Sequence, residues 1–281
     1  MVARGTWDDM RIRVLTMNVQ HDAGDPRRTG LINVELRRLS PDLVALQEVR
    51  KDQLATLLDG TGLAHVTHQE DVLRSDWSDG TVLATRWPHR VVDVQEHRPA
   101  EGDVHWWTLA AAVDVPELGE LLFIQPATPW RLDQAGAREA QLLAAVEVDQ
   151  LHRFRLPSII AGDLNATPKS AGIRFLTGLQ SLGGRSAHYH DAWVVGGNGT
   201  GYTWTVANPL AAAEIERLVG QPHHRRRIDY IFVGSAHSHP TARARILHAE
   251  LIGDAPVDGV WLSDHFGVLA DLEYSLDPLA G

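Results

Sequence analysis

Short apolar runs bounded by glycine, proline and charged residues recur along the chain, and this pattern constrains its fold more than any other feature. Runs of this length that are rich in valine, isoleucine and leucine are typical of β-strands in a buried sheet. They predict strands over residues 11–17, 43–46, 81–84, 91–94, 109–115, 121–124, 158–161, 228–233, 244–251 and 266–272.

Helical periodicity occurs in fewer places, over residues 31–39, 52–58, 133–154 and 171–176. The first of these should stop before Pro41, because a proline disfavours the helical conformation of the residue before it. Asp52 is a good N-cap for the second. In the longest helix the residues predicted to face the core are Ala137, Ala140, Leu143, Ala144, Val148 and Leu151. Helices dispersed among many strands indicate an α/β (α+β) fold in which two β-sheets pack face to face with helices outside.

The length of 281 residues allows one large domain or two small ones, and no proline- or serine-rich linker or internal repeat divides the chain. We therefore predict a single domain over residues 10–275, with tails over residues 1–9 and 276–281. We expect this domain to be a monomer.

The composition limits both the chemistry and the location of the protein. Because the chain has no cysteine, a metal ion would have to bind carboxylate, amide, imidazole or water ligands. A formal net charge of −10 gives little bulk attraction to nucleic acid, although a local basic groove is compatible with an acidic chain. No apolar run reaches the ~18 residues that span a bilayer, and residues 1–10 lack the apolar segment of a signal peptide. These features predict a cytoplasmic protein without a membrane span; the alternative is a mature chain whose leader was removed.

Polar residues of a particular kind stand beside several of the predicted strands. They are Asn18, Glu48, Asp163, Asn165, Asp229, Asp264 and His265. A carboxylate beside an apolar strand is costly unless it meets a hydrogen bond, an opposite charge or a metal. Each residue alone has another interpretation, such as a turn for Asn18, a surface acid for Glu48, or an ion pair with residues 225–227 for Asp229. Together they predict one shared polar site at an edge of the sheets.

The motifs that carry these residues resemble the endonuclease/exonuclease/phosphatase superfamily. In chain order they are Met17-Asn18, Gln47-Glu48, Gly162-Asp163-Leu164-Asn165, Arg227-Ile228-Asp229-Tyr230 and Ser263-Asp264-His265. Residues 79–88, which end in Thr85-Arg86-Trp87-Pro88, are similar to the central strand motif of the same family. The resemblance covers residues 11–274 and implies a four-layered sandwich of two mixed β-sheets.

The resemblance also implies a role for each residue of the site. Glu48 would be the central ligand of Mg²⁺, or alternatively of Mn²⁺, with Asn18 beside it; both are hard cations that favour oxygen ligands. Asp163 would orient and deprotonate the attacking water, and Asn165 would hold the phosphate. Asp229 and His265 would contact the scissile phosphate. Asp264 would fix the orientation of the imidazole, and contact with a metal is an alternative role for it.

One motif of the family is absent. Members carry a histidine in an Asn-x-His-Leu-like motif before the long helix, whereas residues 123–133 contain Thr128 and Trp130 near that position. Thr128 and Arg131 are therefore candidates to bind the phosphate, and the guanidinium of Arg131 could do so through two hydrogen bonds. The alternative for Arg131 is a solvated residue at the start of the helix.

The basic residues 223–227 precede Asp229 and make Arg227 a further candidate phosphate contact; the alternative is a solvated loop. Together these features predict a Mg²⁺-dependent hydrolase, a phosphodiesterase or phosphatase, that acts on a small phosphorylated molecule, a nucleotide or a phospholipid head group. Two alternatives stay open. One is a metal-dependent endonuclease or exonuclease on DNA or RNA, and the other is a catalytically impaired protein of the same fold that binds a phosphate ligand.

Overall fold

The computed structural model describes residues 9–73, 79–97 and 106–276. The predicted tails therefore lie outside the described residues, apart from Asp9 and Leu276. The second of these belongs to the last strand, so the regular structure extends one residue beyond the predicted boundary. No helix in these ranges has the length and apolar character needed to cross a bilayer.

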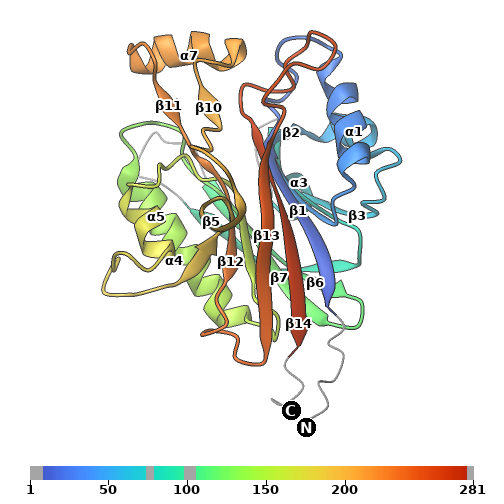
Figure 1. Ribbon diagram of the computed structural model, residues 1–281, viewed down its shortest axis with the longest axis vertical. Helices are drawn as coiled ribbons and strands as arrows, with labels where there is room; N and C mark the ends of the chain where they lie inside the picture. The colour runs from blue at the N-terminus through green and yellow to red at the C-terminus, as the bar shows by residue number, and fades with distance from the viewer. Residues whose placement is uncertain (1–8, 74–78, 98–105, 277–281) are drawn as a thin grey trace.

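Two six-stranded sheets form the centre of the molecule (Figure 1). The first has the order β13 (Ala242–Ile252), β14 (Gly267–Leu276), β1 (Met10–Asn18), β2 (Leu43–Arg50), β4 (Asp79–Thr85) and β3 (His65–His68). The second has the order β5 (His89–His97), β6 (Trp106–Val115), β7 (Gly119–Ala127), β8 (Ile159–Asp163), β12 (Asp229–Gly234) and β9 (Tyr189–Asp191). Each sheet has one parallel pair near its middle, β1 with β2 and β7 with β8, and its other pairs are antiparallel. The prediction of two mixed sheets is confirmed.

The side chains of each central strand alternate between two cores, as the two-residue period of a strand requires. Val14 and Ala45 belong to the large apolar cluster between the sheets, whereas their neighbours Leu15 and Val44 face the other way. There they meet α1 (Arg28–Leu39) and α2 (Leu54–Leu58), which follows the 3₁₀ turn Lys51–Gln53. On the far side of the second sheet, α4 (Ala135–His152) and α5 (Ala171–Leu176) cover a third cluster. The four predicted layers are therefore present, and Figure 1 shows α1 and α4 on opposite sides of the sheets.

The buried face of α4 differs from the predicted apolar stripe. Of the predicted residues Ala137, Ala140 and Leu151 are exposed, and the buried face includes Arg138, Gln141, Leu142, Ala145, Val146 and Asp149. The polar members of this face each make hydrogen bonds to the protein. Gln141 Nε2 donates to the carbonyl oxygens of Trp107 and Ala127 at 2.8 and 2.7 Å. Hydrophobicity alone cannot identify a face whose polar residues are buried with partners.

Several short elements were not predicted, among them α3 (Gln69–Val72), α6 (Ala192–Gly196) and the pair β10 (Trp204–Thr205) and β11 (Arg225–Arg226). The largest is α7 (Pro209–Val219), whose N-cap Asn208 accepts a hydrogen bond from Leu210 N–H at 3.0 Å. Ala211 and Ile215 of α7 pack on Trp204 and Ile228. Figure 1 shows β10, β11 and α7 projecting from one end of the sandwich.

Candidate functional site

The polar residues predicted from the strand ends converge where the two sheets meet. Asn18 is the last residue of β1, and Glu48 lies near the end of β2 in the same sheet. Asp163 ends β8 of the other sheet and is paired in register with Asp229, the first residue of β12. Both sheets therefore contribute carboxylates to one place. The packing of the sandwich holds them together even though they are far apart in the sequence.

The backbone of β2 is irregular where it carries Glu48. The register with β4 shifts between Leu46 and Val49, and such bulges are frequent beside active sites because they redirect side chains. Glu48 has a φ of 54°, and Asn165 has a φ of 48°. A left-handed conformation of a non-glycine residue costs about 1–3 kcal/mol and persists only where surrounding contacts enforce it. At Glu48 one such contact is visible, because its carbonyl oxygen accepts the His21 N–H at 2.8 Å.

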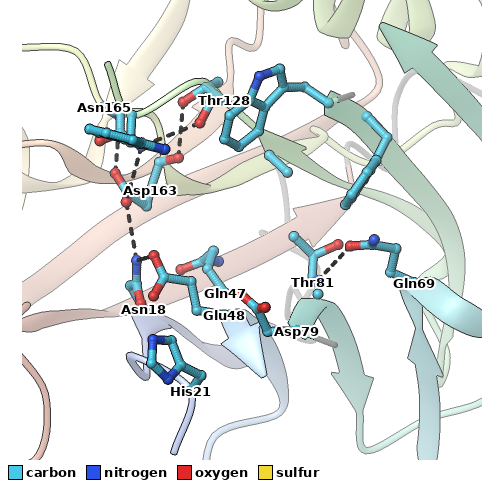
Figure 2. Close-up of a pocket in the computed structure, with 15 residues that line it drawn as sticks. Asn18, His21, Gln47, Glu48, Gln69, Asp79, Thr81, Thr128, Asp163 and Asn165 are labelled. Carbon is cyan, nitrogen blue, oxygen red and sulfur yellow. Dashed lines mark hydrogen bonds between the residues drawn. The ribbon is translucent and has the colours of Figure 1, made fainter. Parts of the chain in front are cut away.

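Asn18 joins the carboxylates of the two sheets. Its Nδ2 donates to Glu48 Oε1 at 2.9 Å and lies 3.3 Å from Asp163 Oδ2 (Figure 2). Asp163 also accepts from Asn165, through the backbone N–H at 2.9 Å and through Nδ2 at 3.2 Å. Thr128 Oγ1 donates to the Asp163 carbonyl oxygen at 3.3 Å, which places Thr128 beside the carboxylates, and its predicted contact with phosphate stays a prediction.

His265 is held by a different carboxylate from the one that was predicted. Its Nδ1 lies 3.0 Å from Asp229 Oδ2, and its Nε2 lies 3.9 Å from Asp163 Oδ2. The expectation that Asp264 orients the imidazole is therefore wrong. Asp264 Oδ1 instead lies 3.2 Å from Ser263 Oγ. The reason is the turn before β14, which directs the two adjacent side chains, Asp264 and His265, to different partners.

Burial and mutual repulsion shift the protonation of the site. Burial raises the pKa of Glu48 to about 7, the negative charges of Asp264 and Asp163 add to the rise, and the hydrogen bond from Asn18 opposes it. Burial raises the pKa of Asp163 to about 6, with a further contribution from Asp229. Burial alone would lower the pKa of His265, but the charges of Asp229, Asp163 and Asp264 hold it well above its usual value. The site therefore combines carboxylates that are costly to ionise with an imidazolium.

The donor set fits a divalent cation. Ligand atoms of Asp163, Asp229 and His265 lie within 4.8 Å of one another. Asp229 Oδ1 is buried and has no hydrogen-bond partner among the described residues. Buried carboxylate oxygens usually have a partner, and a hard cation prefers such oxygens. Burial is the main cause of the raised pKa values of Glu48 and Asp163, and neighbouring carboxylates add to it, so a cation bound between them would favour their ionised forms.

Two cavities open beside these residues. The first has a volume of about 300 Å³ and is lined by Asn18, His21, Gln47, Glu48, Gln69, Asp79, Gly80, Thr81, Trp106, Trp107, Ala127, Thr128, Trp130, Asp163 and Asn165. Figure 2 shows the polar members of this wall. The second has about 200 Å³ and is lined by Gln20, His21, Glu48, Trp130, Leu132, Asp163, Asn165, Trp204, Glu214, Leu218, Arg226, Ile228, Asp264 and His265. Glu48, Asp163 and Asn165 line both cavities, so both border the carboxylate site.

Two predicted phosphate contacts are not part of this site. Arg227 is 5% exposed, and its Nη1 lies 2.7 Å from Asp191 Oδ2 in a buried ion pair, so its guanidinium is already occupied. Arg131 is half exposed, faces Asp133 at 3.4 Å and lines neither of the two cavities. Sequence reasoning missed Arg226, which lines the second cavity and donates to the Asn165 carbonyl oxygen at 2.7 Å. The basic run 223–227 was a signal for an arginine here, but only the strand register shows which one faces the cavity.

The remaining assignments from sequence stay predictions. Asn18, Glu48, Asp163, Asn165 and His265 lie together as expected, yet their individual roles in binding a metal or in catalysis are not tested by their positions. The same holds for Asp264, which lines the second cavity with His265.

Both the sequence and the fold of the chain are similar to those of known proteins. The sequence pattern of the "Endonuclease/Exonuclease/phosphatase family" matches residues 15–265. No curated protein matches the chain by sequence. Humanized D. rerio TDP2 with 14 mutations has a similar structure, with a TM-score of 0.71 and 21% identity over 93% of this chain and 98% of its own. D. rerio TDP2 in complex with a single-strand DNA product has a TM-score of 0.69 and 20% sequence identity, over 93% of this chain and 98% of its own. An endonuclease/exonuclease/phosphatase from Beutenbergia cavernae DSM 12333 has a TM-score of 0.68 and 24% sequence identity, over 96% of this chain and 73% of its own.

Proposed function

Because the chain belongs to the endonuclease/exonuclease/phosphatase family, whose members are metal-dependent phosphoester hydrolases, we propose that it hydrolyses a phosphodiester of a small molecule with the help of Mg²⁺. The observation that carries the proposal is the convergence of Asn18, Glu48, Asp163 and Asn165 from two sheets around one cavity. A second observation is the imidazolium of His265 beside them.

Three residues of the site have different roles in the proposed hydrolysis. Asp163, with a pKa of about 6 before a cation binds, is suited to accept a proton from the attacking water near neutral pH. Asn165 Nδ2 lies 3.2 Å from Asp163 Oδ2 and 3.3 Å from the Thr128 carbonyl oxygen, so it would exchange one of these long contacts for a phosphate oxygen. His265 remains protonated through Asp229, so it stabilises the negative charge that develops on the phosphate oxygens.

The cation would be held mainly by Glu48 and Asn18, with Asp163 or Asp264 completing the set. We favour this placement over Asp163, Asp229 and His265, because His265 Nδ1 is already paired with Asp229 and the raised pKa keeps the ring protonated. A protonated imidazole cannot ligate a metal. When bound, the cation supplies charge neutralisation at the phosphate and lowers the pKa of water.

The position of the two cavities supports a diester over a monoester. A diester carries two substituents on its phosphorus, and two cavities border the carboxylate site. The volumes, about 300 and 200 Å³, suit small groups rather than a long duplex.

The proposal is tested with a panel of phosphodiesters and phosphomonoesters in Mg²⁺, in Mn²⁺ and in chelator. We expect metal-dependent cleavage of diesters, and loss of that cleavage in Glu48→Gln. Glu216→Gln, on the exposed face of α7, is the matched control and should retain it. Absence of cleavage throughout the panel, or full activity of the Glu48 variant, would overturn the proposal.

A nuclease is the second candidate, because one similar structure, D. rerio TDP2, is described in complex with a single-strand DNA product. Arg226 in the second cavity offers a positive charge for a nucleic-acid backbone. Cleavage of single-stranded oligonucleotides at a rate that exceeds that of small diesters and falls steeply with salt would favour this candidate. Binding of phosphate ligands without turnover under any condition would instead favour the catalytically impaired alternative.

A further inference from the structure

Three residues in the wall of the first cavity each carry an unpartnered polar atom. Gln69 Nε2, Thr81 Oγ1 and Trp107 Nε1 are buried and have no hydrogen-bond partner among the described residues. The three residues are at most 8% exposed. Since buried polar groups in proteins nearly always have a partner, three such atoms around one cavity indicate that a ligand or ordered water supplies it.

The amide of Gln69 has a fixed orientation. Its Oε1 accepts the backbone N–H of Thr81 at 3.0 Å, and the reversed amide would place two donors against each other. Gly80 makes this arrangement possible, because a Cβ at that position would lie 2.7 Å from Gln69 Oε1. The Nε2 group of Gln69 is therefore left as a donor without a partner in a residue that lines the cavity, and Figure 2 shows Gln69 and Thr81 side by side at this wall.

Aromatic rings form another part of the same wall. Trp106 and Trp107 begin β6, and Trp130 follows the end of β7. The Trp130 side chain is 46% exposed, which leaves its ring available at the mouth of the cavity. Exposed tryptophan beside polar groups is typical of sites that stack planar rings.

We propose that this cavity is a subsite for a nucleobase whose nucleoside is esterified to the scissile phosphate. The inference rests on the proposed function and names the substrate class of that same site. A nucleobase has a planar ring for the tryptophans and an edge on which acceptors adjoin N–H donors. Gln69 Nε2 and Trp107 Nε1 would donate to the acceptors, and the carboxylate of Asp79 would accept from a donor.

The hydrogen-bond donors and the tryptophan rings of the cavity wall favour a nucleobase over two other kinds of ligand. A quaternary ammonium group fits an aromatic cage with a nearby carboxylate, but it accepts no hydrogen bond and would leave Gln69 Nε2 and Trp107 Nε1 unpaired. A polyol would satisfy the donors but gains little from three tryptophan rings. The volume of about 300 Å³ is sufficient for one base and excludes a stack of several.

Binding is measured by calorimetry without metal, so that the result is independent of turnover. The probes are the nucleoside 5′-monophosphates, ribose 5-phosphate as the same ligand without a base, and phosphocholine. We expect at least one nucleotide to bind ten times more tightly than ribose 5-phosphate or phosphocholine. Trp107→Phe, which keeps an aromatic ring and removes the N–H, and Gln69→Glu, which keeps the acceptor for Thr81, should each reduce that preference several-fold. Gln150→Ala, on the exposed face of α4, should not change it.

The values of kcat/KM for thymidine 5′-(p-nitrophenyl phosphate) and for methyl p-nitrophenyl phosphate are then compared in Mg²⁺. The Gln69 and Trp107 variants should lower kcat/KM for the nucleotide ester alone. Equal affinity of nucleotides and ribose 5-phosphate, or equal effects of the variants on both esters, would overturn the base subsite while the hydrolase assignment stands. Base-dependent binding with neither ester cleaved would support the subsite and overturn the hydrolase.

Discussion

Replacing Glu48 by glutamine should stabilise the metal-free protein at alkaline pH while it abolishes activity. Glu48 has a pKa of about 7 in the folded protein, against a reference value of 4.5 for the same group. Between these values the folded state binds more protons than the unfolded state, so stability falls as the pH rises from 4.5 to 7. At 1.36 kcal/mol per pKa unit the full cost above this range is about 3 kcal/mol.

Glutamine removes the charge and keeps an oxygen that can accept from Asn18 Nδ2. In chelator at pH 8.5 we expect the midpoint of thermal unfolding to rise by roughly 6–12 °C, at about 2–4 °C per kcal/mol for a chain of this size. At pH 5, where Glu48 is mostly protonated in the folded wild type, the gain should be much smaller.

Calorimetry or circular dichroism at both pH values measures the effect, and Glu216→Gln serves as the control for charge removal at an exposed position. Mg²⁺ should raise the unfolding temperature of the wild type more than that of Glu48→Gln, because a ligand that binds the folded state stabilises it. A variant that melts at or below the wild-type temperature at pH 8.5 in chelator would refute the reasoning that this carboxylate is held under electrostatic strain.

Other substitutions separate chemistry from structure. Asp163→Asn should lower kcat about 10²–10⁴-fold in a diester assay, because the residue that we propose accepts the proton of water is lost. Asp229→Asn removes a charge that holds the pKa of His265 up, so the alkaline limb of the kcat–pH profile should move to lower pH. Arg131→Ala should keep kcat/KM within about threefold, since its guanidinium faces Asp133 outside the cavities and typical surface changes are small. Arg227→Ala should destabilise the fold by about 3–5 kcal/mol in urea unfolding, because it leaves Asp191 buried without its cation.

Strands that are apolar and bounded by turns could be predicted from the sequence, because a buried strand needs little beyond that pattern. The elements that escaped prediction are those whose stability comes from tertiary contacts. The strand β11 contains Arg225 and Arg226, and its hydrophobicity gives no sign of a strand. The face of α4 was misassigned for a related reason, since Gln141 and Asp149 are buried with partners that are distant in the sequence.

The composition of the site could be predicted, but the pairing within it could not. Polar residues beside several apolar strands predicted one shared site at an edge of the sheets, so Glu48 and Asp163 were expected together, although they come from different sheets. Whether His265 meets Asp229 or the adjacent Asp264 depends on the path of a turn, which no local pattern specifies. In the same way three consecutive arginines look alike in sequence, and only the register of β11 separates the buried ion pair of Arg227 from the cavity position of Arg226.

The order of the first sheet has a consequence for how the protein matures. Its inner strand β1 is hydrogen-bonded to β2, which follows soon after it, and to β14, which comes from the far end of the described chain. During synthesis on the ribosome one edge of β1 must therefore stay unpaired until β14 has emerged, and such edges recruit chaperones or aggregate. Asp264 and His265 lie directly before β14. The pairing of β14 with β1 thus also brings Asp264 and His265, the last polar residues in chain order, to the site.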